Sequence, residues 1–192
     1  MAYIPKILAI PGSLREGSYN KKMLHVAAAG AKAAGAEVTI VDLRDFNLPM
    51  FDEDLEAKGT PESARKLKQL MKDADGFLVA SPEYNSSISA ALKNAIDWAS
   101  REAEGEKPLA AFAGKVAILM SASPGALGGL RGLVTVRSIL GNIQTIVLPQ
   151  QIALSKAHEA FDEDGKMKDP KQQSRIEGLG KELVEFIAKL KG

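Results

Sequence analysis

Short apolar runs alternate with segments of helical periodicity along the whole chain, and this alternation constrains the fold more than any other feature of the sequence. Four runs are typical of buried strands and a weaker fifth follows them, at residues 4–10, 38–41, 76–80, 116–120 and 143–148. Helical spacing of apolar residues is found at residues 18–34, 61–74, 88–101, 128–140 and 172–190. Strands that alternate with helices in this way predict an α/β fold with a parallel sheet.

The number of elements narrows the topology. A length of 192 residues fits a single domain, and we find no linker or internal repeat, so one domain is expected over residues 1–192. Connections between parallel strands are almost always right-handed, which leaves few arrangements. We therefore predict a doubly wound, three-layer sandwich with a five-stranded parallel sheet in the order 2-1-3-4-5.

Composition excludes several classes of function. The chain has no cysteine, so disulfides, thiol nucleophiles and thiolate metal sites are excluded. Its formal net charge of +1, without a basic cluster, predicts neither a nucleic-acid nor a membrane partner. No secretory leader or membrane-spanning run is evident, so we expect a cytoplasmic protein.

No metal site is expected either. The two histidines, His25 and His158, are far apart in the sequence and have no evident partner ligands. The stretch DEDG at residues 162–165 is similar to part of a calcium loop but lacks the remaining ligand spacing and the closing glutamate. A turn is the better interpretation of this stretch.

Three unusual loops follow the first, third and fourth predicted strands. They read PGSLREGSYN at residues 11–20, SPEYNSS at 81–87 and SASPGALGG at 121–129. The carboxyl ends of parallel strands share one edge of the sheet, and in the predicted order these three strands are neighbours beside the switch point. One ligand can therefore contact all three loops.

The first loop has the parts of an anion site. Ser13 and Ser18 offer hydroxyl groups, Arg15 offers a positive charge, and a helix N-terminus offers free N–H groups. The match to GxxxxGK[ST] fails because Ser18 and Tyr19 stand where lysine and serine or threonine are required, and GxGxxG is absent. A single terminal phosphate fits what remains. The alternative, that Ser18 only caps a helix and Arg15 lies on the surface, stays open.

The other two loops offer groups for a flat ligand. Tyr84 follows a buried strand, where it can stack on or wall off a ring, although a partly buried rim position explains it equally well. The third loop offers the hydroxyl groups of Ser121 and Ser123 and backbone N–H groups beside a glycine-rich helix start. Each loop is a weak signal alone, and the three on adjacent strands are a strong one.

The stretches GSLREGSYN, SPEYNSSISAALKNAIDW and SASPGALGGLRG, in this order, resemble the NAD(P)H-dependent FMN reductases, a flavodoxin-like family that includes quinone, azo and chromate reductases. The resemblance covers nearly the whole chain. It implies that the FMN phosphate is surrounded by Ser13, Arg15, Ser18, Tyr19 and Asn20. It implies that the flavin ring is lined by Pro82, Glu83, Tyr84 and Asn85, with Ser121, Ser123, Pro124 and Gly125 at its other edge. The chain departs from the family at Ser86, Ser89 and Ala90, which affects the mouth over the flavin.

The resemblance also implies the chemistry. No residue of the chain is expected to be a catalytic acid or base, because hydride transfer takes place at N5 of the flavin. NADPH or NADH is the expected hydride donor, a quinone-like molecule the acceptor, and a ping-pong order the sequence of events, in a homodimer or homotetramer. The alternatives are a flavodoxin-like FMN electron carrier without nicotinamide turnover, and a flavin-free binding domain. Such carriers tend to be strongly acidic, which this chain is not.

Overall fold

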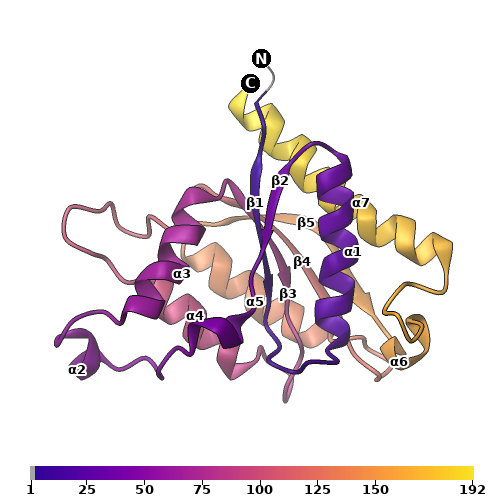
Figure 1. The fold of residues 1–192 in the computed structure, drawn as a ribbon, viewed down its shortest axis with the longest axis horizontal. Coiled ribbons are helices and arrows are strands. Elements are labelled where there is room, and N and C mark those ends of the chain that lie inside the picture. Colours follow the sequence, from indigo (N-terminus) through magenta and orange to yellow (C-terminus); the bar gives the residue numbers. More distant parts are fainter. Residues whose placement is uncertain (1–2) are drawn as a thin grey trace.

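A five-stranded parallel sheet in the order β2-β1-β3-β4-β5 forms the centre of the computed structural model, which describes residues 3–192 (Figure 1). The strands are β1 (Lys6–Pro11), β2 (Glu37–Ile40), β3 (Gly76–Ala80), β4 (Val116–Ala122) and β5 (Ile146–Leu154). Each neighbouring pair is parallel. The predicted fold and strand order are therefore confirmed.

Helices cover both faces of the sheet. One face is covered by α1 (Tyr19–Ala33) and α7 (Pro170–Lys191), and the other by α3 (Glu62–Asp73), α4 (Ala90–Ser100) and α5 (Leu130–Asn142). The five predicted helices match these within a few residues. Three short helices were not predicted: η1 (Leu43–Phe46), α2 (Glu53–Glu56) and α6 (Ala157–Ala160). No helix among residues 3–192 has the length and apolar content that crossing a membrane requires.

The sheet divides the core into two layers because successive strand side chains point to opposite faces. In β1, Ile7 and Ala9 pack beneath α1 and α7, whereas Leu8 and Ile10 pack beneath α3 and α4. All four side chains are buried. Complete burial of each large aliphatic side chain stabilises the fold by about 1.5–3 kcal/mol, so the central strands form a rigid base for the loops at their ends.

Close packing of α7 fixes the position of α1. A β-carbon at Gly30 of α1 would lie 2.0 Å from the carbonyl oxygen of Glu177, and one at Gly180 of α7 would lie 2.0 Å from that of Ala27. Only glycine permits these backbone contacts. The N-terminus of α1, which faces the first of the three loops, is therefore held at a fixed height above the sheet.

The fifth strand differs most from its prediction. It was expected at residues 143–148 and is found at Ile146–Leu154. Ile143 is the residue that ends α5, and Gln144 lies in a left-handed turn with φ 67°. Pro149 and two glutamines interrupt the apolar pattern, but β5 is an edge strand, and a register shift between the partners of Ala117 and Leu119 accommodates them.

The first strand differs slightly. It was expected from residue 4 and begins at Lys6, because Ile4 is exposed and lies before the first pairing with β2.

Candidate functional site

The three loops meet at the carboxyl edge of the sheet, as predicted from strand order. Backbone hydrogen bonds connect them to neighbouring strands: the N–H of Gly12 donates to Ala80 O (2.9 Å), that of Ser81 to Met120 O (2.8 Å) and that of Ser123 to Leu154 O (3.0 Å). We call residues 12–18 the phosphate loop, after the group that the sequence predicts for it, 81–89 the second loop and 123–129 the third loop. Each predicted site residue lies in one of them or within two residues of it.

The phosphate loop is ordered by two buried serines. Ser13 Oγ accepts a hydrogen bond from the N–H of Arg15 (3.3 Å), and Ser18 is the N-cap of α1, where its Oγ accepts from the N–H of Lys21 (3.4 Å). The first N–H groups of α1 have no partners inside the helix and carry its positive dipole end. The local structure is that of an anion site at a helix N-terminus.

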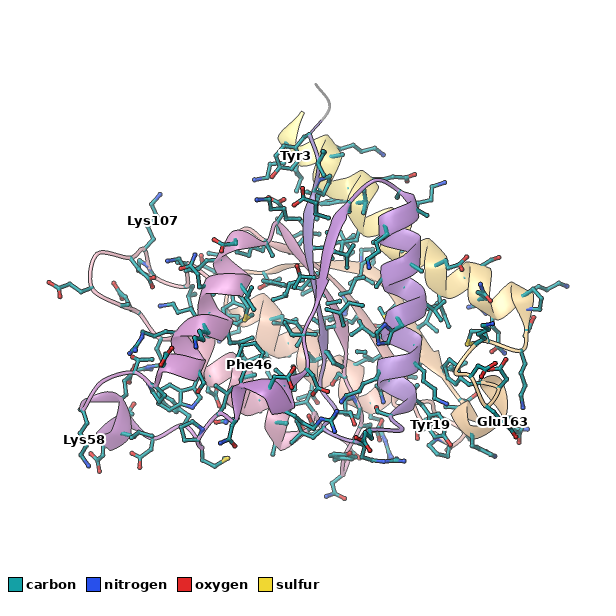
Figure 2. All side chains as sticks on the ribbon, viewed as in Figure 1. Tyr3, Tyr19, Phe46, Lys58, Lys107 and Glu163 are labelled. Carbon is teal, nitrogen blue, oxygen red and sulfur yellow. The ribbon has the colours of Figure 1, made fainter. Side chains whose placement is uncertain are left out.

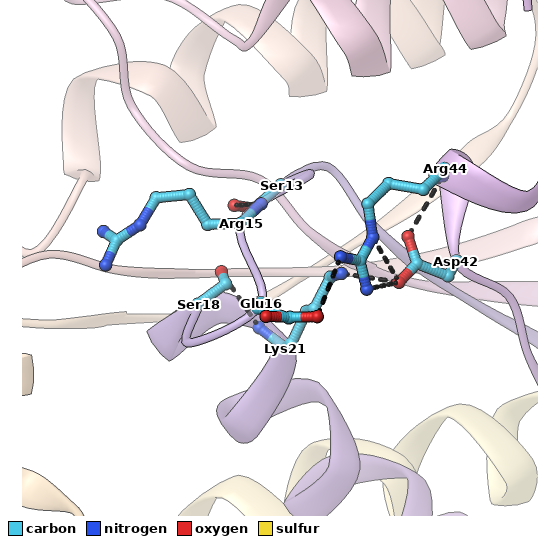
Figure 3. A network of polar contacts seen from close by, with 7 residues as sticks. All are labelled: Ser13, Arg15, Glu16, Ser18, Lys21, Asp42 and Arg44. Carbon is cyan, nitrogen blue, oxygen red and sulfur yellow. Dashed lines mark hydrogen bonds and ion pairs between the residues drawn. The ribbon is translucent and has the colours of Figure 1, made fainter. Parts of the chain in front are cut away.

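An ionic network closes one side of this loop (Figure 3). Asp42 follows β2 and accepts from Lys21 Nζ (2.6 Å) and Arg44 Nη2 (2.9 Å), and Arg44 also pairs with Glu16 at 3.6 Å. Burial alone would raise the pKa of Asp42, but the hydrogen bonds from Arg44 and Lys21 outweigh it and hold the pKa far below its usual range. The charge of Lys21 is therefore neutralised by Asp42.

Arg15 differs from these basic residues. Its side chain is exposed and extends away from the network around Asp42 (Figure 3). Among the described residues no ion pair to Arg15 is found. Arg15 is therefore the basic side chain of the phosphate loop that is available to an anion.

Tyr19 and Asn20 fasten the start of α1 to the rest of the protein. Asn20 is buried, its Nδ2 donates to Ala122 O (2.9 Å), and its Oδ1 accepts from the N–H of Ala122 (3.0 Å). The Tyr19 ring stacks on that of Phe161, with 6.3 Å between the ring centres. Both side chains therefore have partners within the protein, and their contact with a phosphate stays a prediction.

The second loop contains a two-residue turn that is strained at Ser86. Tyr84 and Ser87 pair through two backbone hydrogen bonds (3.0 and 3.1 Å), and Asn85 and Ser86 between them have φ of 51° and 66°. Asparagine followed by glycine is a preferred pair at these two positions, so Ser86 stands where glycine is usual. The turn holds the Tyr84 side chain 51% exposed at the rim, where it can cover a ligand.

Glu83 connects the second loop to α5. Its carboxylate accepts hydrogen bonds from the N–H groups of Arg131 (3.0 Å) and Gly132 (3.3 Å) and from Arg131 Nε (2.9 Å). Burial would raise the pKa of Glu83, but these hydrogen bonds and the Arg131 charge outweigh it and lower the pKa. The Glu83 side chain therefore caps a helix, and it is the backbone here that is free to face a ring.

The third loop is built on tight backbone contacts. Ser121 is fully buried, and a β-carbon at Gly129 would lie 1.9 Å from its Oγ. Ser123 Oγ accepts from the N–H of Gly125 (3.2 Å), and Pro124 and Gly125 are exposed at the edge. The third loop thus offers backbone and Ser123 to a ligand, while Ser121 lies underneath.

Sequence reasoning missed two serines. Ser89 caps α4, accepts from the N–H of Leu92 (3.2 Å) and donates to Gly12 O, so it joins the second loop to the phosphate loop. Its place directly before an apolar helical repeat is an N-cap signal that identifies it. Ser81 is fully buried beside Ser121, and neither hydroxyl has a hydrogen-bond partner among the described residues. No sequence signal distinguishes Ser81 from a simple strand end.

A hollow of about 460 Å³ adjoins the phosphate loop. It lies between that loop, the segment after β2 and the start of α4, and its apolar members include Leu14, Leu48, Met50, Ala90 and Ala91. Met50 is 71% exposed and Leu14 47%. A group of three or more potential metal ligands is not found among residues 3–192.

The arrangement fits FMN. A phosphate needs a cation and free N–H groups, which Arg15 and the N-terminus of α1 provide beside β1. A flat ring needs exposed backbone and a covering aromatic side chain, which Tyr84 and the second and third loops provide beside β3 and β4. Ligands of such open sheets bind at this edge, beside the switch point.

Comparison with known proteins agrees with this geometry. Residues 5–159 match the family model described as NADPH-dependent FMN reductase. An NAD(P)H-dependent FMN reductase of Pseudomonas aeruginosa is 36% identical over 188 residues, which cover 97% of each chain. An NAD(P)H:quinone oxidoreductase of Solanum tuberosum is 36% identical over 193 residues, covering 97% of this chain and 95% of the relative.

A solved structure shows the same fold. The flavoenzyme NAD(P)H:(acceptor) oxidoreductase of Paracoccus denitrificans superposes with a TM-score of 0.82 and 30% sequence identity. The match covers 97% of this chain and 98% of the other. Similarity in sequence and in fold thus extends over the three loops and the elements that carry them.

Proposed function

The chain belongs to the NADPH-dependent FMN reductase family, and we propose that it holds FMN across the three loops, as an NAD(P)H oxidoreductase for quinone-like acceptors. Its homologues are FMN reductases and quinone oxidoreductases. The observation that carries the proposed site is Arg15, an exposed cation beside the free N-terminus of α1, without an ion-pair partner among residues 3–192. We further propose that residues 1–192 form one domain around this site.

The phosphate is assigned to the phosphate loop. Arg15 neutralises its charge, and the first N–H groups of α1 donate to its oxygens. Ser13 and Ser18 hold this backbone in place through their hydrogen bonds to Arg15 and Lys21. Because Asp42 neutralises Lys21, the loop carries charge for one phosphate group and not for a triphosphate.

The ring is assigned to the second and third loops. When bound, FMN supplies hydride transfer at its N5 atom. The chain supplies the backbone at Pro82, Asn85 and Pro124, which orients one edge of the ring, and Tyr84, which covers it from the rim. No side chain is needed as an acid or base. One open face serves NAD(P)H and the acceptor in turn, which corresponds to a ping-pong order.

The acceptor is assigned only as quinone-like. Azo dyes, chromate and free flavin are further candidates that the same open face can admit. A flavodoxin-like electron carrier is the alternative, and the net charge of +1 speaks against it. Dependence on NAD(P)H favours the expected cytoplasmic location.

We also propose that the chain acts as a homodimer or homotetramer. The hollow beside the phosphate loop supports this, because Met50 and Leu14 expose apolar surface next to the flavin site. A second copy that covers the hollow would close the site on that side. Met50→Asp should then lower the mass in solution, measured by light scattering, whereas a native monomer would contradict the proposal.

An anaerobic titration tests the function. The purified protein should show the yellow flavin spectrum, bleach with NADPH or NADH, and recover its colour when a benzoquinone is added. A protein that gains no colour with added FMN would overturn the flavin site. A yellow protein that neither nicotinamide bleaches would leave only the electron carrier, and bleached protein that no quinone reoxidises would overturn the acceptor class.

A further inference from the structure

The stretch FDEDGKM at residues 161–167 forms a tight hairpin between β5 and α7. Phe161 and Met167 pair as an antiparallel bridge, and the N–H of Gly165, with φ 80°, donates to Asp162 O (3.1 Å). Asp162 Oδ1 accepts from the N–H of Lys166 (2.8 Å). The stretch is thus the turn that its sequence predicts. It is ordered by several internal hydrogen bonds although it belongs to none of the three loops of the site.

Phe161 lies against the start of α1. Its side chain is buried, its ring lies almost parallel to that of Tyr19 (12° between the planes), and Lys22 Nζ lies 5.8 Å from its centre. Figure 2 shows Tyr19 at the end of α1 that faces the loops and Glu163 of the hairpin in the same corner of the molecule. The hairpin therefore packs against the first turn of α1, the helix that follows the phosphate loop.

The same segment also holds the third loop. Just before the hairpin, the N–H of Ala157 donates to Ser123 O (3.1 Å), and Leu154 O accepts from the N–H of Ser123 (3.0 Å). Asn20 in turn joins α1 to Ala122, the residue before that loop. Residues 154–167 thus contact both the helix that follows the phosphate loop and the third loop, without being part of the assigned flavin site.

We propose that Phe161 is a positioning residue which sets the affinity of the phosphate loop for phosphate through its stack on Tyr19. The proposal rests on the proposed function, since it concerns the phosphate end of the same site. Tyr19 is the first residue of α1, and its backbone N–H belongs to the first turn. Hydrogen bonds weaken steeply when the donor angle changes, so a first turn that loses its support donates less well to a phosphate.

The test compares FMN with riboflavin, which has the same ring and no phosphate. The apoprotein and its Phe161→Leu variant are titrated with each flavin, and quenching of flavin fluorescence gives the dissociation constants. We expect Phe161→Leu to weaken FMN binding roughly tenfold, about the loss of one hydrogen bond to a charged group, and to leave riboflavin binding nearly unchanged. A general disturbance of the fold would instead weaken the binding of both flavins equally.

Matched variants separate the possible outcomes. Phe186→Leu removes a ring that packs on the same core layer from the last turns of α7, and it should keep the FMN-to-riboflavin ratio of the wild type. Phe161→Tyr keeps the stacked rings and should also keep the ratio. If Phe161→Leu does not fold, Phe161→Met is a second variant without the ring, and its flexible side chain adapts to the space that the ring leaves.

A double substitution tests the route through Tyr19. In a Tyr19→Leu background, Phe161→Leu should cause no further loss of FMN preference. A full additional loss, or an unchanged ratio in Phe161→Leu alone, would overturn the proposal while leaving the flavin site intact. If the wild type itself binds FMN no better than riboflavin, the phosphate assignment fails instead.

Discussion

Arg15 carries the phosphate assignment at the scale of single residues. Arg15→Ala should weaken FMN binding by about 1.5–3 kcal/mol, the range for hydrogen bonds to charged groups, and leave riboflavin binding unchanged. Fluorescence titration of the apoprotein measures both. The matched control is Lys58→Ala, which removes an equal charge from an exposed position after α2. Equal FMN affinity in Arg15→Ala and the wild type would contradict the assigned role.

The turn of the second loop stores strain at Ser86. A left-handed conformation with φ of 66° costs conformational free energy in a residue other than glycine. We expect Ser86→Gly to raise the free energy of unfolding by up to about 1 kcal/mol, partly offset by the larger entropy of glycine in the unfolded chain. Urea unfolding measures the change. Ser87→Gly changes the next residue, which has no positive φ, and should lower the free energy of unfolding. An equal loss of stability in Ser86→Gly and Ser87→Gly would show that Ser86 is not strained.

At the scale of elements, α5 receives its N-terminal cap from another loop. Gly129 is the N-cap residue and has no side chain, and the Glu83 carboxylate takes its place. Glu83→Ala should lower the free energy of unfolding by about 1 kcal/mol at pH 7, as other lost caps do. Thermal denaturation of the apoprotein measures this, with the exposed Glu102→Ala as control. Wild-type stability of Glu83→Ala would show that the cap contributes nothing.

The same elements show what the sequence can and cannot predict. The order of the strands, their parallel direction and the edge that their carboxyl ends share follow from hydrophobic periodicity and from crossover handedness. The three loops could therefore be placed beside one another from the sequence. The extent of β5 could not, because the burial pattern of an edge strand with a bulge is irregular around Pro149. The sequence also could not predict that Glu83 caps α5 or that Asn20 forms hydrogen bonds with the backbone of Ala122. Those contacts join residues far apart in the chain, and local patterns carry no signal for them.

At the scale of the whole molecule, the start of β1 and the end of α7 lie together at the edge of the sheet opposite the site (Figure 1). Asp75, just before β3, accepts hydrogen bonds from Tyr3 Oη (2.7 Å) and the N–H of Lys6 (2.8 Å) and pairs with Lys191 Nζ at 3.3 Å. Burial would raise the pKa of Asp75, but the Lys6, Tyr3 and Lys191 contacts outweigh it and lower the pKa. One carboxylate thus joins the first strand to the last helix.

This junction should make stability depend on pH in the acid range. Because the native pKa of Asp75 is below the value of about 3.9 expected in the unfolded chain, its contribution is fully present above that value and is lost as pH falls through the native pKa. Asp75→Asn should therefore cost about 1–2 kcal/mol at pH 7, and the cost should shrink as the pH falls through the native pKa of Asp75, measured by urea unfolding of the apoprotein. Asp73→Asn, an exposed neighbour whose carboxylate accepts a hydrogen bond from Gln69, should show little cost at any pH in this range. A cost for Asp75→Asn that does not fall as the pH is lowered through the acid range would mean that its charge does not hold β1 and α7 together.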